Sequence, residues 1–258
     1  MWRLGVCAWG LGLSFLLSEP VLAGAWNQPK GQGQAIVKYE PVWSIHWLDK
    51  DGVRYNLPEE RVDHVVSLWA EYGVTERLTV LVKTDWQDVG DSQINFQGMG
   101  PTEIGGRYRL WSDERMIVSA QASLVSDSDG RNAAWSSAGF GETEAELRLL
   151  AGRSFGGRYP SFFEAQLAHR WRDNLPSEMR VEGAAGVHFN DRYMGLFQVY
   201  AGKTLPDDKS FEGRWNTYEL GVVRHWSDWS AQLGWRSTVA GRNITAGDGP
   251  ILGIWRRF

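Results

Sequence analysis

The sequence predicts an all-β protein, a transmembrane antiparallel up-and-down β-barrel of about 12 strands with long extracellular loops and short periplasmic turns. Three observations predict this fold class. Segments that alternate apolar and polar residues recur from residue 33 to the end of the chain. Long and short connections follow one another between these segments, and aromatic residues gather at the segment ends. A strand of such a barrel has about 9–11 residues, with apolar side chains facing lipid and polar ones facing inward.

The first 23 residues are expected to be a signal peptide, which leaves residues 24–258 as the mature barrel. Arg3 makes the start of the chain positive, an apolar run extends from Leu4 to Leu17, and Val21-Leu22-Ala23 precedes the expected cleavage site. The run is shorter than the about 20 apolar residues of a membrane-spanning helix. The single cysteine, Cys7, lies in this segment, so the mature chain is expected to form no disulfide and no thiolate metal site.

Composition limits the partners and the alternative folds. The formal net charge is −4 and the mean hydropathy is −0.36, so the chain has no basic footprint for nucleic acid. The expected partners are outer-membrane lipids, the barrel-assembly machinery and a small solute of unknown identity, and no cofactor and no metal are expected. A soluble β-sandwich with a core of tryptophans is the alternative fold, but it would favour aromatic residues in the middle of strands.

The clearest strand is Pro101–Trp111, in which Ile104 and Tyr108 alternate with Glu103 and Arg107. Further period-2 segments bring the number of expected strands to twelve. They are Gly33–Trp43, Val62–Tyr72, Arg77–Trp86, Arg115–Val125, Glu142–Gly152, Ser161–Trp171, Met179–Phe189, Tyr193–Gly202, Trp215–His225, Ser230–Val239 and Gly249–Phe258. The alternation changes phase near Val222-Val223, which indicates a β-bulge there.

The connections predict which end of the barrel faces outward. Tight turns are expected at 73–76, 112–114, 190–192 and 227–228. Long loops are expected at 44–61, 87–100, 126–141, 203–214 and 240–248. The connection at 153–160 is longer than the outer loop that follows it, so the alternation of tight turns and long loops fails once. An even number of strands places both ends of the chain in the periplasm.

Aromatic residues are expected to form girdles at the two membrane interfaces. The outer girdle would comprise Trp43, Trp47, Trp86, Trp171 and Trp215. The periplasmic girdle would comprise Tyr72, Trp111, Tyr193, Trp226, Trp229, Trp255 and Phe258. Phe258 ends an alternating final strand, and a terminal phenylalanine resembles the assembly signal of bacterial outer-membrane proteins.

Short motifs resemble small proteobacterial outer-membrane barrels of the transporter-like kind. The segment from Gly98 to Leu110 resembles a strand of the family named for the MetA pathway of phenol degradation, Gly-x-Gly-Asp-x-x-x-Gly-x-Arg-Tyr-x-Leu, with Pro101 at the Asp position. The turn from Tyr72 to Leu78 and the mature start from Gly24 to Gln34 also resemble such barrels. The resemblance implies the fold and the outer-membrane location, and it leaves the solute open.

Charged residues of both signs are expected to face the lumen and to set its selectivity. These candidate lumen residues are Glu103, Arg107, Arg109, Glu142, Glu144, Glu146, Arg148, Glu164, Arg170, Arg172, Arg180, Glu182, Glu219 and Arg236. One interpretation is a wet channel whose charges select small solutes, and another is a sealed structural or surface-interaction barrel held by ion pairs. Too few residues precede the first strand for a plug domain, so a plug would have to come from the loop at 44–61 or 126–141.

A lipid-modifying hydrolase is the third interpretation, because outer-membrane lipid hydrolases of similar size use a Ser–His pair on the lipid-facing wall. His64 and His169 are expected to point outward near the outer rim, but neither has a serine at a matching position on its own strand. No catalytic residue is therefore assigned, and the chain is expected not to be an enzyme. A channel or transporter for small solutes is the favoured function.

Overall fold

The computed structural model describes residues 24–90, 95–126, 143–173, 175–205 and 212–258. In these residues it contains thirteen β-strands and no helix. They are β1 (Gly33–Leu48), β2 (Arg54–Gly73), β3 (Leu78–Gly90), β4 (Asn95–Met99), β5 (Glu103–Ser112), β6 (Met116–Val125), β7 (Glu144–Phe155), β8 (Ser161–Arg172), β9 (Glu178–Asn190), β10 (Tyr193–Thr204), β11 (Arg214–Trp226), β12 (Trp229–Arg242) and β13 (Ile244–Arg257).

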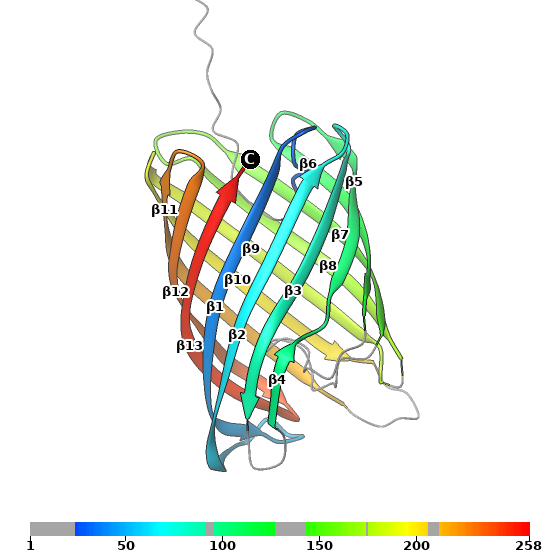
Figure 1. The fold of residues 1–258 in the computed structure, drawn as a ribbon, viewed down its shortest axis with the longest axis vertical. Coiled ribbons are helices and arrows are strands. Elements are labelled where there is room, and N and C mark those ends of the chain that lie inside the picture. Colours follow the sequence, from blue (N-terminus) through cyan, green and yellow to red (C-terminus); the bar gives the residue numbers. More distant parts are fainter. Residues whose placement is uncertain (1–23, 91–94, 127–142, 174, 206–211) are drawn as a thin grey trace, which may run out of the picture.

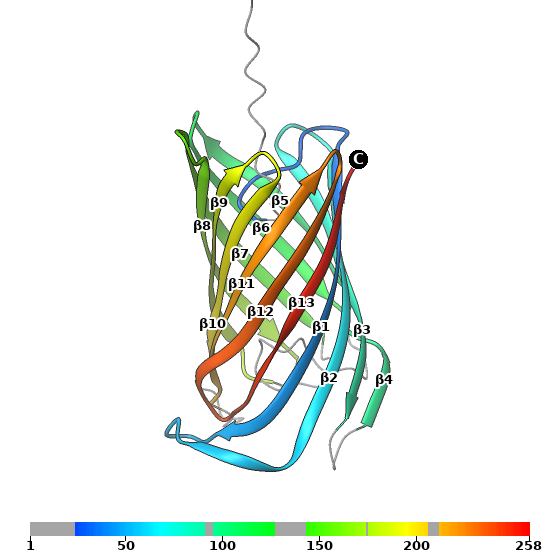
Figure 2. The same ribbon diagram turned by 90° about the vertical axis from the view of Figure 1, so that its left-hand side faces the viewer.

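The strands form one closed antiparallel barrel (Figures 1 and 2). Neighbours in sequence are neighbours in space, and β1 pairs with β13 from Gln34 opposite Arg257 to Leu48 opposite Ile244, which closes the sheet. The strands β4 and β5 both pair with β3, one after the other along its length, so together they fill one position of a twelve-position barrel. Closure pairs the long strands of the wall on both sides, which satisfies their backbone groups in lipid, whereas the short strand β4 pairs with β3 alone.

A short interruption separates β4 from β5. Pro101 lies in it and has no N–H for the ladder, which is why a strand is usually broken at such a residue. Gly100 still donates its N–H to the carbonyl oxygen of Asp85 at 2.9 Å, so the backbone stays beside β3. A Cβ at Gly100 would lie 1.8 Å from Oδ1 of Asp85, and a larger residue would therefore have to displace the Asp85 side chain.

The outer wall of the barrel is apolar. Leu124, Leu220 and Ile104 expose 67%, 66% and 64% of their surface on the outward face of their strands. Exposed apolar patches on soluble monomers rarely exceed a few hundred Å². This wall therefore faces lipid, as the alternation predicted.

The two ends of the barrel differ. At the turn end, connections of two to five residues join β2 to β3, β5 to β6, β7 to β8, β9 to β10 and β11 to β12. The C-terminus lies at this end (Figure 1). At the loop end the expectation of long loops fails in part. The strand β1 continues to Leu48 and pairs with β2 from Arg54, and β12 and β13 are separated by Asn243 alone.

The long loops expected at 44–61 and 240–248 are therefore wrong, and the one expected at 87–100 is reduced by β3 and β4. The physical reason is that these hairpins reach past the apolar wall into water, as the exposed side chains of Arg54 and Asn56 show. Backbone pairing continues there while the apolar alternation stops. The loop expected at 126–141 lies outside the described residues except for Ser126, and the one at 203–214 is described only at its two ends.

Three further expectations need correction. Trp215 and Trp255 lie at strand ends, but each exposes 3% of its surface and faces the interior rather than an interface. Trp215 is four residues from Glu219 on the same strand, so alternation places both side chains on the inward face. The bulge expected near Val222-Val223 is absent, and the register of β11 against β12 shifts between Asn216 and Thr217 instead. Val223 is fully buried, and Val222 faces outward.

Candidate functional site

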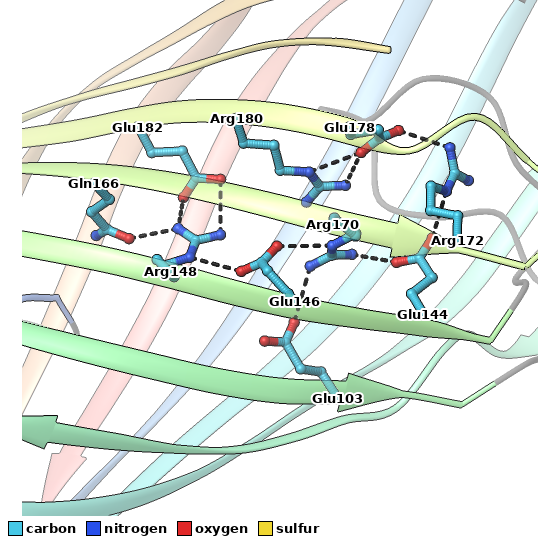
Figure 3. Close-up of polar contacts among 10 residues, drawn as sticks. All are labelled: Glu103, Glu144, Glu146, Arg148, Gln166, Arg170, Arg172, Glu178, Arg180 and Glu182. Atoms are coloured by element: carbon cyan, nitrogen blue, oxygen red, sulfur yellow. Dashed lines mark hydrogen bonds and ion pairs between the residues drawn. The ribbon is translucent and has the colours of Figure 1, made fainter. Parts of the chain in front are cut away.

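The loop-end half of the lumen contains a continuous chain of ion pairs (Figure 3). We call it the Glu–Arg ladder and define it as Glu103, Glu144, Glu146, Arg148, Gln166, Arg170, Arg172, Glu178, Arg180 and Glu182. Carboxylate and guanidinium alternate through it. Arg148 bonds Glu182 and lies 2.8 Å from Glu146, whose other oxygen accepts from Arg170 Nε at 2.8 Å.

Glu144 continues the ladder. Its two oxygens accept from Arg170 Nη1 at 2.5 Å and from Arg172 Nε at 2.8 Å. Arg172 Nη1 then donates to Glu178 at 2.7 Å, and Glu178 also accepts from Arg180 Nη2 at 2.6 Å. Bridging carboxylates of this kind keep every charge of the ladder compensated in a site from which bulk water is largely removed.

Strand register explains why these residues meet. Glu144 lies directly opposite Arg172, and Glu146 lies opposite Arg170, across the β7–β8 pair. Glu178 lies opposite Arg170 across β8–β9. Because side chains alternate between the two faces, residues two apart on one strand line the same wall, and opposite charges stand across from one another.

A second group of charges lies on the opposite part of the wall. Arg236 on β12 donates from Nε to Glu219 at 2.9 Å and from Nη2 to Glu40 at 2.7 Å. Lys38 Nζ lies 3.5 Å from the second carboxylate oxygen of Glu219. Glu219 and Arg236 are direct partners across β11–β12, while Glu40 and Lys38 belong to β1.

A cavity of about 140 Å³ lies between these groups in the middle of the barrel. Ladder residues such as Arg148 and Arg170 line one side, and Lys38, Lys83 and Glu40 line the other. A space of this size holds several water molecules, and its lining offers both donors and acceptors. Among the described residues, no group of three or more His, Cys, Asp or Glu side chains is arranged to hold a metal ion.

The turn-end half of the lumen contains an apolar cluster and is partly filled by the start of the described chain. Phe162, Met194 and Trp255 are buried there in one cluster. Residues 24–29, which we call the N-terminal segment, turn back into the barrel at this end (Figure 2). Trp26 meets Phe162 edge to face, with ring centroids 5.9 Å apart.

Polar contacts hold the N-terminal segment in place. Asn27 Nδ2 donates to the carbonyl oxygen of Arg107 at 3.1 Å, and Gln28 Nε2 donates to Glu71 at 3.1 Å. Glu71 also pairs with Arg107 at 2.8 Å. The expectation that only the loop at 44–61 or 126–141 could enter the lumen is therefore wrong. Six residues are enough to occupy this part of the lumen, because the barrel wall anchors them and they do not need to form a packed domain of their own.

The structure brings most of the candidate residues together. Glu103, Arg107, Glu164, Arg172, Glu219, Arg236 and the ladder residues predicted from alternation all lie on inward faces. Arg109 also lies on the inward face, but it is only half-buried at the turn end, next to a register shift between Arg109 and Trp111. Glu142 lies outside the described residues.

The sequence reasoning missed several inward charges. Glu178 accepts from two arginines of the ladder, and it directly precedes the strand predicted from Met179. Glu40 and Lys38 lie on one face of the first predicted strand, and Glu71 lies on the second. The same alternation that found Glu144 and Glu146 would have found these residues, because each shares a face with polar neighbours.

Comparisons with known proteins identify the fold. The structure is similar to an outer-membrane channel from Pseudomonas putida F1, with a TM-score of 0.69 and 12% identity over 91% of this chain and 98% of that one. It is also similar to the NanC porin, with a TM-score of 0.57 and 10% identity over 85% of this chain and 98% of that one. The KdgM porin in complex with oligogalacturonate gives a TM-score of 0.55 and 11% identity over 87% and 99% of the two chains.

No family model and no curated protein matches the sequence. Within the described residues no helix has the length and apolar character to cross a membrane. The fold is that of an outer-membrane β-barrel. Its apolar outer wall and its charged interior agree with that placement, since lipid and water demand opposite surfaces on the two sides of each strand.

Proposed function

We propose that this protein is an outer-membrane channel for small polar solutes, and that the Glu–Arg ladder is its selectivity element. One observation carries the proposal, namely the cavity of about 140 Å³ that charged groups of both signs surround in the middle of the lumen. A purely structural barrel of this width gains more from apolar filling than from ion pairs, because desolvating charges offsets much of their attraction. The solved structures to which it is similar are an outer-membrane channel and two porins, which supports the same function.

The ladder suits selection because its charges are fixed by one another. Each guanidinium is held by at least one carboxylate, so the positions of positive and negative potential along the wall are preset. A solute that carries polar or charged groups replaces its lost hydration by bonding to such preorganised groups. We place the turn end in the periplasm, because both termini of an even-numbered barrel lie on the same side as its short turns.

A sealed barrel is the second candidate, and the N-terminal segment favours it. Trp26 and its neighbours occupy the turn end of the lumen, so passage requires a path around them or their displacement. The two candidates differ in whether the folded protein conducts. Removal of residues 24–29 should open a barrel that this segment alone seals.

We propose that the chain does not act as an enzyme. His64 bonds Tyr39 through Nδ1 at 2.9 Å, and His169 lies 3.3 Å from the sulfur of Met179, so neither activates a serine on the lipid-facing wall. Ser230 does bond His225, at 2.8 Å, but it exposes 3% of its surface and faces the lumen. A lipid substrate in the membrane does not reach that position.

Single-channel current across a planar bilayer tests the channel. Under a salt gradient, Arg148→Ala should shift the reversal potential toward cation selectivity, because Glu182 then lacks its guanidinium partner and Glu146 keeps only Arg170. Glu182→Gln should shift it the other way. Arg158→Ala, in an exposed turn, is the control.

Silence of the folded wild-type protein together with current from the chain lacking residues 24–29 would indicate a barrel sealed by that segment. Silence of both would reject the channel. Conductance with equal reversal potentials in all variants would place the selectivity element outside the ladder.

A further inference from the structure

Glu164 differs from the carboxylates of the Glu–Arg ladder. It lies on β8, exposes 2% of its surface, and accepts hydrogen bonds from the backbone N–H of Ala25 and from Gln166 Nε2, both at 2.9 Å. Both donors are neutral amides. Among the residues that the structure describes, no lysine or arginine forms an ion pair with it, whereas the ladder carboxylates each meet a guanidinium. A buried carboxylate of this kind lacks the cation that would stabilise its charge.

The start of the described chain is fixed directly against this carboxylate. A Cβ at Gly24 would lie 1.7 Å from Oε2 of Glu164, so the main chain of Gly24 is in contact with the carboxylate, and a larger residue would have to displace the end of the Glu164 side chain. Ala25 is fully buried, and its carbonyl oxygen accepts from Ser119 Oγ at 2.8 Å. Trp26 covers Gly152, where a Cβ would lie 2.6 Å from the indole ring.

We propose that cleavage of the peptide bond between Ala23 and Gly24 creates an α-ammonium group on Gly24 that pairs with Glu164, and that this ion pair seats the N-terminal segment in the turn end of the lumen. The reaction is hydrolysis by a signal peptidase. Water supplies the hydroxyl that makes the carboxylate of Ala23 and the hydrogen that completes the amine of Gly24, which then takes a proton from solvent. The bond that breaks is the amide C–N bond, and no oxidant or reductant takes part.

Cleavage changes the partner that Glu164 meets. Before it, the nitrogen of Gly24 is a neutral amide with one hydrogen. After it, the same nitrogen carries a positive charge and three donors, which are the properties that a buried carboxylate requires. Val21-Leu22-Ala23 supplies the small or modest side chains that a signal peptidase reads, so cleavage forms the new amine on Gly24, the residue whose main chain contacts Glu164. Cleavage of the signal peptide thereby supplies the cation that pairs with Glu164 inside the barrel.

The test measures how accessible the new α-amine is. The complete precursor is expressed, the processed protein is purified in detergent, and intact mass defines its first residue. The folded protein is then treated with an amine-reactive ester, and labelling of the N-terminal peptide is followed by mass spectrometry. We expect the chain to begin at Gly24 and its α-amine to label at least about tenfold more slowly than in the urea-unfolded protein, because labelling requires local opening.

Two variants should remove this protection. Glu164→Gln removes the charge and leaves one acceptor oxygen in place of two, and Gly24→Ala places a methyl group where the carboxylate of Glu164 lies, so both variants should label near the unfolded rate. Glu182→Gln, an inward carboxylate that pairs with Arg148 instead, should keep the wild-type protection. Heat-dependent gel migration shows that each variant is folded.

A first residue other than Gly24 would overturn the proposal. Rapid labelling of the folded wild type would also overturn it, as would full protection in both Glu164→Gln and Gly24→Ala. None of these readouts depends on whether the barrel conducts, so the proposal stands or fails separately from the channel.

Discussion

At the scale of single residues, the interior depends on arginines that each serve several carboxylates. Arg170 is the extreme case, since its guanidinium lies 2.5 Å from Glu144, 2.8 Å from Glu146 and 3.5 Å from Glu103. These carboxylates come from β5 and β7, while Arg170 comes from β8. One side chain therefore joins strands up to three positions apart along the wall.

Arg170→Met should destabilise the barrel strongly. The change keeps much of the side-chain volume but removes one of the two arginines that Glu144 and Glu146 each contact and the arginine beside Glu103, and breaking buried pairs in this way costs about 3–5 kcal/mol. Arg158→Met, in the exposed turn after β7, should change the free energy of unfolding by no more than about 0.5 kcal/mol. Urea unfolding of both variants in detergent measures the difference, and equal stability of the two would show that the ladder does not hold the wall.

At the scale of elements, the turn end is built from short turns whose side chains satisfy the backbone. Asp113 Oδ1 accepts from the N–H groups of Arg115 at 2.8 Å and Met116 at 2.7 Å, between β5 and β6. Asn190 does the same for Arg192 and Tyr193 between β9 and β10. Such turns fix how one strand is paired with the next.

The Asp113 turn should weaken in acid. The backbone hydrogen bonds from Arg115 and Met116 lower the pKa of Asp113 below its ordinary value, because they stabilise the ionised carboxylate. The folded-state pKa is thus below the unfolded one, so the stabilisation is present above the unfolded pKa and is lost as the pH falls through the folded pKa.

The wild type should therefore be more stable than Asp113→Ala at pH 7, and this difference should shrink as the pH falls below about 4. Urea unfolding across that pH range measures it. Asp191→Ala is the control, because Asn190 makes the backbone bonds in that turn. A difference that persists unchanged into acid would assign the stabilisation to something other than ionised Asp113.

At the scale of the whole molecule, the barrel exists only when its last strand meets its first. Phe258 donates its N–H to the carbonyl oxygen of Gly33 at 3.0 Å, and Gly33 donates to Phe258 at 2.7 Å. The ring of Phe258 covers Gly33, where a Cβ would lie 2.6 Å from it. It remains 58% exposed on the outside, and we propose that the barrel-assembly machinery recognises it there.

Phe258→Ala should lower the yield of folded barrel, because it removes both the exposed terminal ring and its packing on Gly33. Tyr159→Ala, which removes an aromatic ring from an exposed turn, should not lower it. The measurement is the fraction of membrane-extracted protein that migrates differently before and after boiling. Equal fractions in the two variants would remove the assembly role of the terminal phenylalanine.

The sequence by itself determined the strands of the apolar wall and the residues that face inward. Alternation with a period of two is a local property, because lipid and lumen select opposite side chains along every strand. This is why Glu144, Arg170 and Arg236 could be placed on the inner face without any structure. The same local rule failed where the hairpins extend past the apolar wall near Leu48 and Asn243, since lipid no longer covers their outer face while Leu48 and Ile244 still pack inward with Trp215.

Only the tertiary structure decided which inward residues meet. The pairing of Arg236 with Glu40 joins residues 196 positions apart, and it requires the closure of β1 on β13. The position of the N-terminal segment in the lumen could not be predicted from the sequence either. Trp26 and Gln28 lie in no repeating pattern, and their partners belong to strands far away in the sequence. Closure of the sheet creates the enclosed lumen. Contacts inside it depend on how all the strands are arranged around it, and the sequence of one strand does not specify that arrangement.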